Sequence, residues 1–173
     1  MKKIFVIFMI LFVGLGIFAG CSKVSSGVVR IHIRANSNSE CDQSVKLVVR
    51  DAVVEYITPL IAECSDSNAV LGILENNLDN IEMVANEVLL VSNFNYVSHA
   101  KITNEYFPTR EYGTHVFPAD YYDALIINLG SGAGNNWWCV AYPPLCFIGN
   151  AEVDGQVRYK SKLIELINKY FGR

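Results

Sequence analysis

Cys139 is the residue whose type and setting most directly suggest chemistry. Together with His32, His99 or His115, its thiolate could act as a nucleophile beside a general base. An exported thiol hydrolase that uses Cys139 is therefore one hypothesis for this chain. Cys146 offers a simpler partner, because a disulfide between Cys139 and Cys146 would close a short ring across two prolines.

The glycine-rich segment at residues 130–134 and two pairs of carboxylates have simpler explanations than a site. A phosphate-binding loop needs a helix directly after its glycines, whereas the residues that follow here are typical of a strand. Glu40 with Asp42, and Asp120 with Asp123, lie at an expected helix start and an expected turn. Neither CxxC, nor Cys/His metal spacing, nor an EF-hand loop occurs. We therefore expect no metal, no cofactor and no acid–base dyad.

The segment at residues 137–147 combines four aromatic side chains, two cysteines and a double proline. Alternation along a strand would bury one of its two tryptophans and expose the other. An exposed aromatic side chain beside a rigid proline turn is a favoured anchor for a protein partner. The alternative is that both tryptophans complete the core. We expect a partner-binding surface formed by the exposed members of the set Trp137, Trp138, Pro144, Leu145 and Arg110.

The first 21 residues have the layout of a secretory signal. Lys2 and Lys3 precede an apolar run at residues 4–18, which is followed by two small residues and Cys21. The run is shorter than the roughly 20 residues that span a bilayer as a helix, so we expect a cleaved leader, with an uncleaved anchor as the alternative. The residues around Cys21 are similar to a bacterial lipobox, which predicts lipidation of Cys21; an ordinary cleavage site is the alternative. All these interpretations put the mature chain outside the cytoplasmic membrane, secreted or tethered to its outer face.

The remainder of the chain has the composition of one acidic domain. Without the leader it carries 12 basic and 17 acidic side chains, a formal charge of −5. It contains no basic run, so the electrostatic footprint of a nucleic-acid-binding protein is absent. Residues 22–27 form a short polar tether, and residues 28–173 are long enough for a single hydrophobic core.

Two helices are predicted directly after a first strand. Residues 29–34 alternate apolar and polar side chains, as in a half-buried strand. Apolar residues then recur at helical spacing from the N-cap Ser39 to Cys64, with a kink or restart at Pro59. A second helix over residues 70–89 follows after a short turn, so the two helices are expected to be antiparallel neighbours.

Strands dominate the second half of the sequence. A period of two predicts strands over residues 96–107, 114–117, 122–129 and 137–142, with tight turns at 108–113 and 118–120. An amphipathic C-terminal helix is expected around residues 163–171. The order of elements predicts an α+β fold: a two-layer sandwich with a mainly antiparallel sheet, a helical hairpin inserted after the first strand, and the C-terminal helix.

Several motifs resemble the stage II sporulation protein R family. The opening motif IHIRANSNS at residues 31–39 is continued by KLVVRDAV at 46–53 and by FPTREYG at 107–113. The strongest likeness is in GSGAG at 130–134 with NWWCV at 136–140, followed by PPLCF at 143–147. The motifs occur in the family's order and cover residues 28–147; the lipobox-like Cys21 is a departure from that pattern.

This resemblance implies a signalling protein of endospore-forming bacteria rather than an enzyme. Members of the family are exported from the forespore to the intermembrane space. There they activate a membrane-embedded aspartic protease of the mother cell, which removes the pro-sequence of sigma-E. The chain would then bind the extracellular face of that protease. A lipoprotein module that binds a wall or small-molecule ligand remains a further hypothesis beside the thiol hydrolase.

Overall fold

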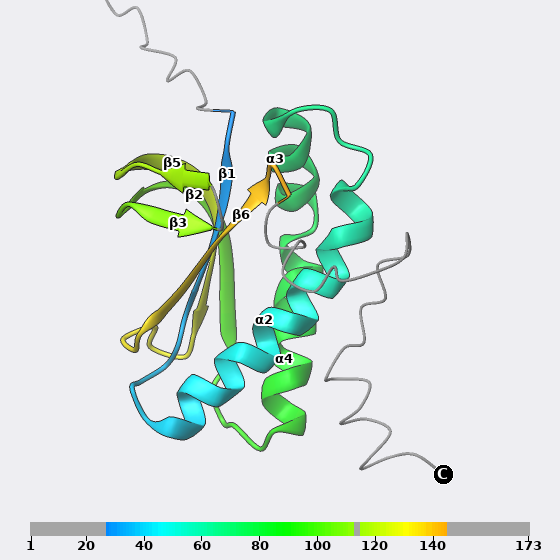
Figure 1. Cartoon of the computed structure of the whole chain (residues 1–173). Coiled ribbons are helices and arrows are strands. Elements are labelled where there is room, and N and C mark those ends of the chain that lie inside the picture. Colours follow the sequence, from blue (N-terminus) through cyan, green and yellow to red (C-terminus); the bar gives the residue numbers. More distant parts are fainter. Residues whose placement is uncertain (1–26, 113–114, 145–173) are drawn as a thin grey trace, which may run out of the picture.

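The computed structural model describes residues 27–112 and 115–144, and these residues form an α+β domain with a mixed sheet and three helices (Figure 1). The predicted leader, Cys21, Leu145, Cys146 and the C-terminal helix lie outside the described residues. The elements in chain order are β1 Val29–Arg34, α2 Glu40–Ile61, α3 Ser67–Asn76, α4 Leu78–Val91, β2 Ser98–Phe107, β3 Arg110–Tyr112, β4 His115–Phe117, β5 Asp120–Leu129 and β6 Asn136–Tyr142.

The main sheet has the strand order β2-β5-β1-β6. Strand β1 pairs in parallel with β5 and antiparallel with β6, while β2 and β5 form an antiparallel pair. Two of the three pairings are thus antiparallel, as expected, but the sheet is mixed because its two central strands run in the same direction. Residues more than 90 positions apart in the sequence are neighbours there, with Ile31 opposite Leu125.

Helix α2 begins and continues as its sequence indicates. The Ser39 hydroxyl accepts a hydrogen bond from the backbone amide of Asp42 at 3.1 Å, which caps the helix. Pro59 lies inside one helix that continues to Ile61, so the helix does not restart there. Because Pro59 is close to the end of α2, little of the helical hydrogen-bond ladder follows it.

The predicted second helix is in fact two helices. Asn77 ends α3 and begins α4, and its backbone N–H donates to Leu74 O at the end of α3. The Tyr56 hydroxyl of α2 donates to Asn77 Oδ1 at 3.0 Å, which fixes the break against the neighbouring helix. Figure 1 shows α3 and α4 returning alongside α2. None of the helices in the described part of the chain is long and apolar enough to span a membrane.

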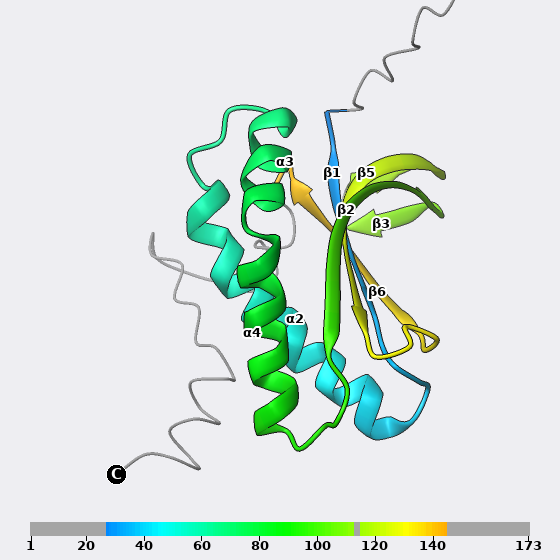
Figure 2. The ribbon, with the colours of Figure 1, turned by 180° about the vertical axis from the view of Figure 1, so that it is seen from behind.

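The helices pack on one face of the sheet, and a smaller apolar cluster occupies the other face (Figures 1 and 2). The main core unites Val29, Ile31 and Ile33 of β1 with the apolar sides of the three helices. The second cluster contains Phe107 and Tyr122 beside other residues of β5. The prediction of a half-buried β1 was therefore wrong: the strand is central, and both of its faces are covered.

Strands β3 and β4, which follow β2 and precede β5 in the sequence, form a separate two-stranded sheet, here called the tip hairpin. The sequence predicted a tight turn over residues 108–113, but Arg110–Tyr112 are extended and pair with His115–Phe117. The prediction failed because a proline fixes its own φ angle but does not by itself make a turn. The chain after Pro108 stays extended and forms β3.

Candidate functional site

The sheet face opposite the helices carries three basic side chains from a single strand. Because residues two apart on a strand point to the same side, Arg30, His32 and Arg34 of β1 form one row. Trp138 of the adjacent strand β6 and Glu105 of β2, which lies beyond β5, are on the same face of the sheet, here called the open face.

Arg30 is fully buried and surrounded by aromatic rings. Its guanidinium carbon lies 4.7 to 5.6 Å from the ring centres of Phe107, Tyr122, Phe117 and Tyr112, of which the last two belong to the tip hairpin. The rings attract the cation through their negative faces.

Hydrogen bonds also fix the guanidinium, although they leave one nitrogen unsatisfied. Arg30 Nε donates to the Cys139 carbonyl and Nη2 to the Tyr112 hydroxyl, both at 3.1 Å, while Nη1 is buried and has no hydrogen-bond partner among the described residues. Burial lowers the pKa of Arg30 from its ordinary value, and the nearby Tyr112 opposes this. The side chain therefore joins the tip hairpin to the sheet.

His32 lies between aromatic rings and a carboxylate. Its ring stacks on Trp138 with centres 3.7 Å apart, and Nδ1 is 3.0 Å from Glu105 Oε1. Since a carboxylate only accepts hydrogen bonds, the proton of the neutral ring is assigned to Nδ1. Burial and then the positive charge of Arg34 lower the pKa of His32, and Glu105 opposes them. His32 is thus a neutral, hydrogen-bonded core histidine at neutral pH.

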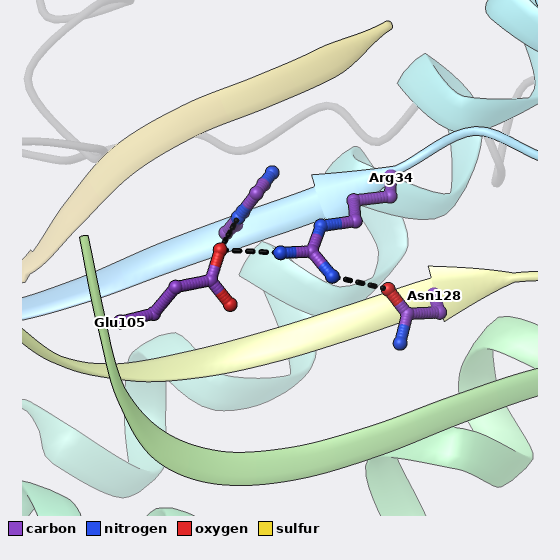
Figure 3. Close-up of polar contacts among 4 residues, drawn as sticks. Arg34, Glu105 and Asn128 are labelled. Atoms are coloured by element: carbon purple, nitrogen blue, oxygen red, sulfur yellow. Dashed lines mark hydrogen bonds and ion pairs between the residues drawn. The ribbon is translucent and has the colours of Figure 1, made fainter. Parts of the chain in front are cut away.

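Glu105 connects His32 to the more exposed end of the row (Figure 3). The same Glu105 oxygen accepts hydrogen bonds from His32 and from Arg34 Nη2. Arg34 Nη1 donates to Asn128 Oδ1 at 3.4 Å. The Arg34 and Glu105 side chains remain 28% and 22% exposed, so this pair lies at the border between the buried row and solvent.

The structure brings Trp138 and Arg110 together and separates Trp137 from them. The Arg110 guanidinium of the tip hairpin lies 5.6 Å from the Trp138 ring centre, on the open face. Trp137 points to the helical side, packs against the main core and has Arg50 of α2 at 5.5 Å. Both tryptophans are half-buried, whereas the sequence predicted one buried and one exposed. Each indole is partly covered by an arginine.

The remaining predicted site residues that the structure describes, Cys139 and Pro144, lie within β6 and just after it. Pro144 is exposed and follows the cis peptide bond between Tyr142 and Pro143. Cys139 is buried and disulfide-bonded; its partner lies outside the described residues, so the pairing with Cys146 stays a prediction. A disulfide-bonded, buried sulfur is not available as the nucleophile that a thiol hydrolase requires.

A buried carboxylate organises the segment after β1. Asp42 accepts hydrogen bonds from the Ser37 and Tyr96 hydroxyls, both at 2.5 Å, and from Asn36 Nδ2 at 3.1 Å. Burial alone would raise the pKa of Asp42, but these hydrogen bonds outweigh it and the pKa is lowered. The predicted capping role of Asp42 at the start of α2 is therefore only part of its role, because it also holds the preceding loop.

The glycine-rich segment packs against that loop. Gly134 N donates to Ala35 O at 2.8 Å, and the Ser131 hydroxyl donates to Asn36 O at 2.7 Å. A Cβ on Gly134 would lie 2.2 Å from Ser37 O, which explains why glycine is needed there. Two of the motifs thus pack against each other: Gly134 allows close approach of two backbone segments, whereas Gly130 and Gly132 have positive φ angles.

Sequence reasoning missed Arg30, Arg34 and Glu105. The signal for the first two was present, since basic residues alternate with isoleucines in β1. Interpreting it required knowing that both faces of β1 are covered. Nothing near Glu105 in the sequence indicates its partners, which come from a strand 71 and 73 residues earlier. Within residues 27–112 and 115–144 no three metal-ligating side chains come together. The charged and aromatic side chains of the open face are of the types that bind a protein partner.

Comparison with known proteins gives one consistent result. The family model described as stage II sporulation protein R matches residues 25–152. Stage II sporulation protein R of Bacillus subtilis (strain 168) is 38% identical over 120 residues, which cover 69% of this chain and 54% of that protein. The chain therefore spans about half the length of the curated relative that it matches. No solved structure matches it.

Proposed function

This chain belongs to the stage II sporulation protein R family, and we propose that it is an exported sporulation signal that acts by binding a membrane-embedded aspartic protease. The family assignment that the motifs predicted is confirmed. In the proposed signalling pathway, the protein is exported from the forespore and binds the extracellular face of the mother-cell protease. Contact favours the active state of the protease, which then removes the pro-sequence of sigma-E.

The observation that carries this proposal is the pairing of Arg110 and Trp138 on the open face. Arg110 is exposed, and Trp138 is half-buried beneath it. Arginine and tryptophan are the residue types that most often dominate protein interfaces. They are supported from below by the stacked ring of His32, so the pair is held in place before any partner binds.

A binding mechanism needs only moderate interaction energy. Shifting a two-state protease from mostly inactive to mostly active takes about 5.5 kcal/mol of difference in binding between the two states. One or two anchor side chains in an interface, each contributing about 2 kcal/mol or more, reach this range. The fold need only present these anchors in a fixed geometry.

The leader fits the proposed location. The predicted signal at residues 1–21 would deliver the domain across the forespore membrane, and lipidation of Cys21 would keep it on the outer face. Intact-mass analysis of protein from membrane and medium fractions tests cleavage, acylation and disulfide formation together. A full-length chain with its leader in the cytosol would contradict the proposal.

Arg110→Ala with Arg50→Ala as its matched control tests the binding surface. Both arginines cover a tryptophan at nearly the same distance, 5.6 and 5.5 Å, but on opposite faces of the sheet. We expect Arg110→Ala to reduce pro-sigma-E processing in sporulating cells at least tenfold, and Arg50→Ala to leave it near wild type. The amount of exported protein is measured in each strain. Equal processing in both variants at equal export would reject this surface.

A further inference from the structure

Helix α4 has a second apolar side, which faces away from the core. Ile81 and Val88 are buried in the main core, whereas Met83 and Leu90 are 61% and 74% exposed. Each exposed residue follows a buried one by two positions, which places it about 200° further around the helix axis. Met83 and Leu90 are seven positions apart and therefore lie on the same side. Apolar side chains on the side of a helix that does not face the core indicate a further contact there.

Carboxylates surround these two apolar side chains. A shallow hollow on this side of the helix, here called the outer side of α4, is lined by Asp79, Glu82, Met83, Asn86, Glu87 and Leu90. The charge of the wider region has the same sign. Residues 51–100, which include the second half of α2 and all of α3 and α4, contain eight acidic side chains and no lysine or arginine. The outer side of α4 is therefore complementary to a segment that is both basic and apolar.

The chain itself contains such a segment at residues 158–173. This segment has five basic side chains and one acidic one, whereas residues 27–144 have six basic and 14 acidic ones. It also contains the apolar residues of the predicted amphipathic helix: Leu163, Ile164, Ile167, Tyr170 and Phe171. A segment joined to the domain through the chain has a high effective concentration at the domain surface, so a modest attraction is enough for binding.

The connection to this segment starts close to the helices and is long enough to reach α4. The hydroxyl of Tyr142, at the end of β6, donates to Ser65 O in the turn between α2 and α3 at 2.7 Å. Thirteen residues separate Pro144 from Arg158, and an extended chain of that length spans up to about 40 Å. Helices α3 and α4 together are about 36 Å long. The whole length of α4 is therefore within reach.

We propose that residues 158–173 bind the outer side of α4 in the same molecule. The apolar side chains of the segment cover Met83 and Leu90, and its basic side chains lie beside the carboxylates. The segment follows residue 152, where the match to the family model ends, so this contact is an addition to the part that the family shares. It does not depend on the proposed function, because the occupant is part of this chain and the open face is on the other side of the sheet.

Oxidation of Met83 by hydrogen peroxide measures whether the outer side of α4 is covered. Met83 is the only methionine after residue 9, and peptide mass spectrometry locates its sulfoxide. We expect Met83 to be oxidised at least fivefold more slowly in the wild-type full chain than in the double variant Ile164→Asp with Ile167→Asp. The control is Val116→Asp, which places the same charge on an exposed valine of the tip hairpin and should leave the rate unchanged.

Cross-linking with a carbodiimide identifies the occupant directly. This reagent joins a lysine to a carboxylate without a spacer, so it links only groups that are in contact. The expected links within one molecule join the lysines of the segment to the carboxylates of α4: Lys160, Lys162 and Lys169 to Asp79, Glu82 and Glu87. The double variant should form these links at least fivefold less often than wild type.

Three results would overturn the inference. The first is an equal rate of Met83 oxidation in wild type and in the double variant, without these links. The second is protection that is lost on dilution, with links between two chains, which would assign the outer side of α4 to a second copy. The third is protection that appears only when detergent-solubilised protease is added, which would assign it to the partner protein. The proposed function is tested separately by Arg110→Ala on the open face.

Discussion

Arg30 is the side chain whose replacement best tests how the tip hairpin is held against the sheet. Its guanidinium is fully buried, faces four aromatic rings and donates two hydrogen bonds. None of the ion pairs found within the described residues includes Arg30. Two replacements distinguish volume from charge: alanine removes both, whereas methionine keeps most of the volume and loses the charge.

The expected magnitudes follow from these contacts. Truncating a buried side chain of this size costs about 2–5 kcal/mol through lost contacts and the cavity. Hydrogen bonds from a charged donor add about 1.5–3 kcal/mol. Removing a cation that is buried without an acid recovers part of this, because the cation no longer has to be desolvated. We therefore expect Arg30→Ala to lower the free energy of unfolding by about 3–5 kcal/mol and Arg30→Met by about 1–2 kcal/mol.

Urea unfolding at neutral pH, followed by tryptophan fluorescence, measures both values. Trp138 reports on the open face because it packs with the second cluster. Trypsin cleavage after Arg110 gives a second measure, since an unanchored tip hairpin should be cut faster in Arg30→Ala. Val116→Ala is the control: Val116 is 61% exposed on the same hairpin, so the change should stay within about 0.5 kcal/mol.

One result would refute the reasoning about Arg30. If Arg30→Ala lowered the free energy of unfolding by less than about 1 kcal/mol, with no faster cleavage, the aromatic surroundings would not hold the hairpin. If Arg30→Met were as damaging as Arg30→Ala, the charge rather than the volume would be the larger contribution.

Three further predictions concern stability. Gly134→Ala should lower the free energy of unfolding by about 2–3 kcal/mol, because its Cβ would collide with backbone atoms. Gly72→Ala in helix α3 should raise it by about 0.5–1 kcal/mol, because there is open space at that position and alanine favours a helix more than glycine. Urea unfolding measures both changes. Asp42→Asn should cost about 2–3 kcal/mol in the same assay, because an amide nitrogen would face hydroxyl donors; a change below 0.5 kcal/mol would contradict this. The lowered pKa of His32 means that the folded state resists its protonation, so the free energy of unfolding should fall as the pH drops below about 6.5; urea unfolding at a series of pH values should show that His32→Asn flattens this dependence.

The local elements of this fold were predictable because their signals lie within a short window. Ser39 was identified as the cap of α2, and the period-two pattern located β2, β5 and β6 to within about two residues. The apolar period did not reveal the break at Asn77, whose side chain bonds Ile73 O within α3 and also accepts a hydrogen bond from Tyr56 of another helix.

The candidate site was only partly predictable for the same reason. Sequence alone determined that Trp137 and Trp138 must point to opposite sides of a strand, because side chains alternate there. Which of them shares a face with Arg110 was decided by the sheet order and by the tip hairpin folding back over β1. Burial of Arg30 and His32 was likewise decided by tertiary structure: partners from distant parts of the chain pair with both edges of β1, and aromatic rings from the tip hairpin, β2 and β6 cover its face, and no local pattern encodes either arrangement.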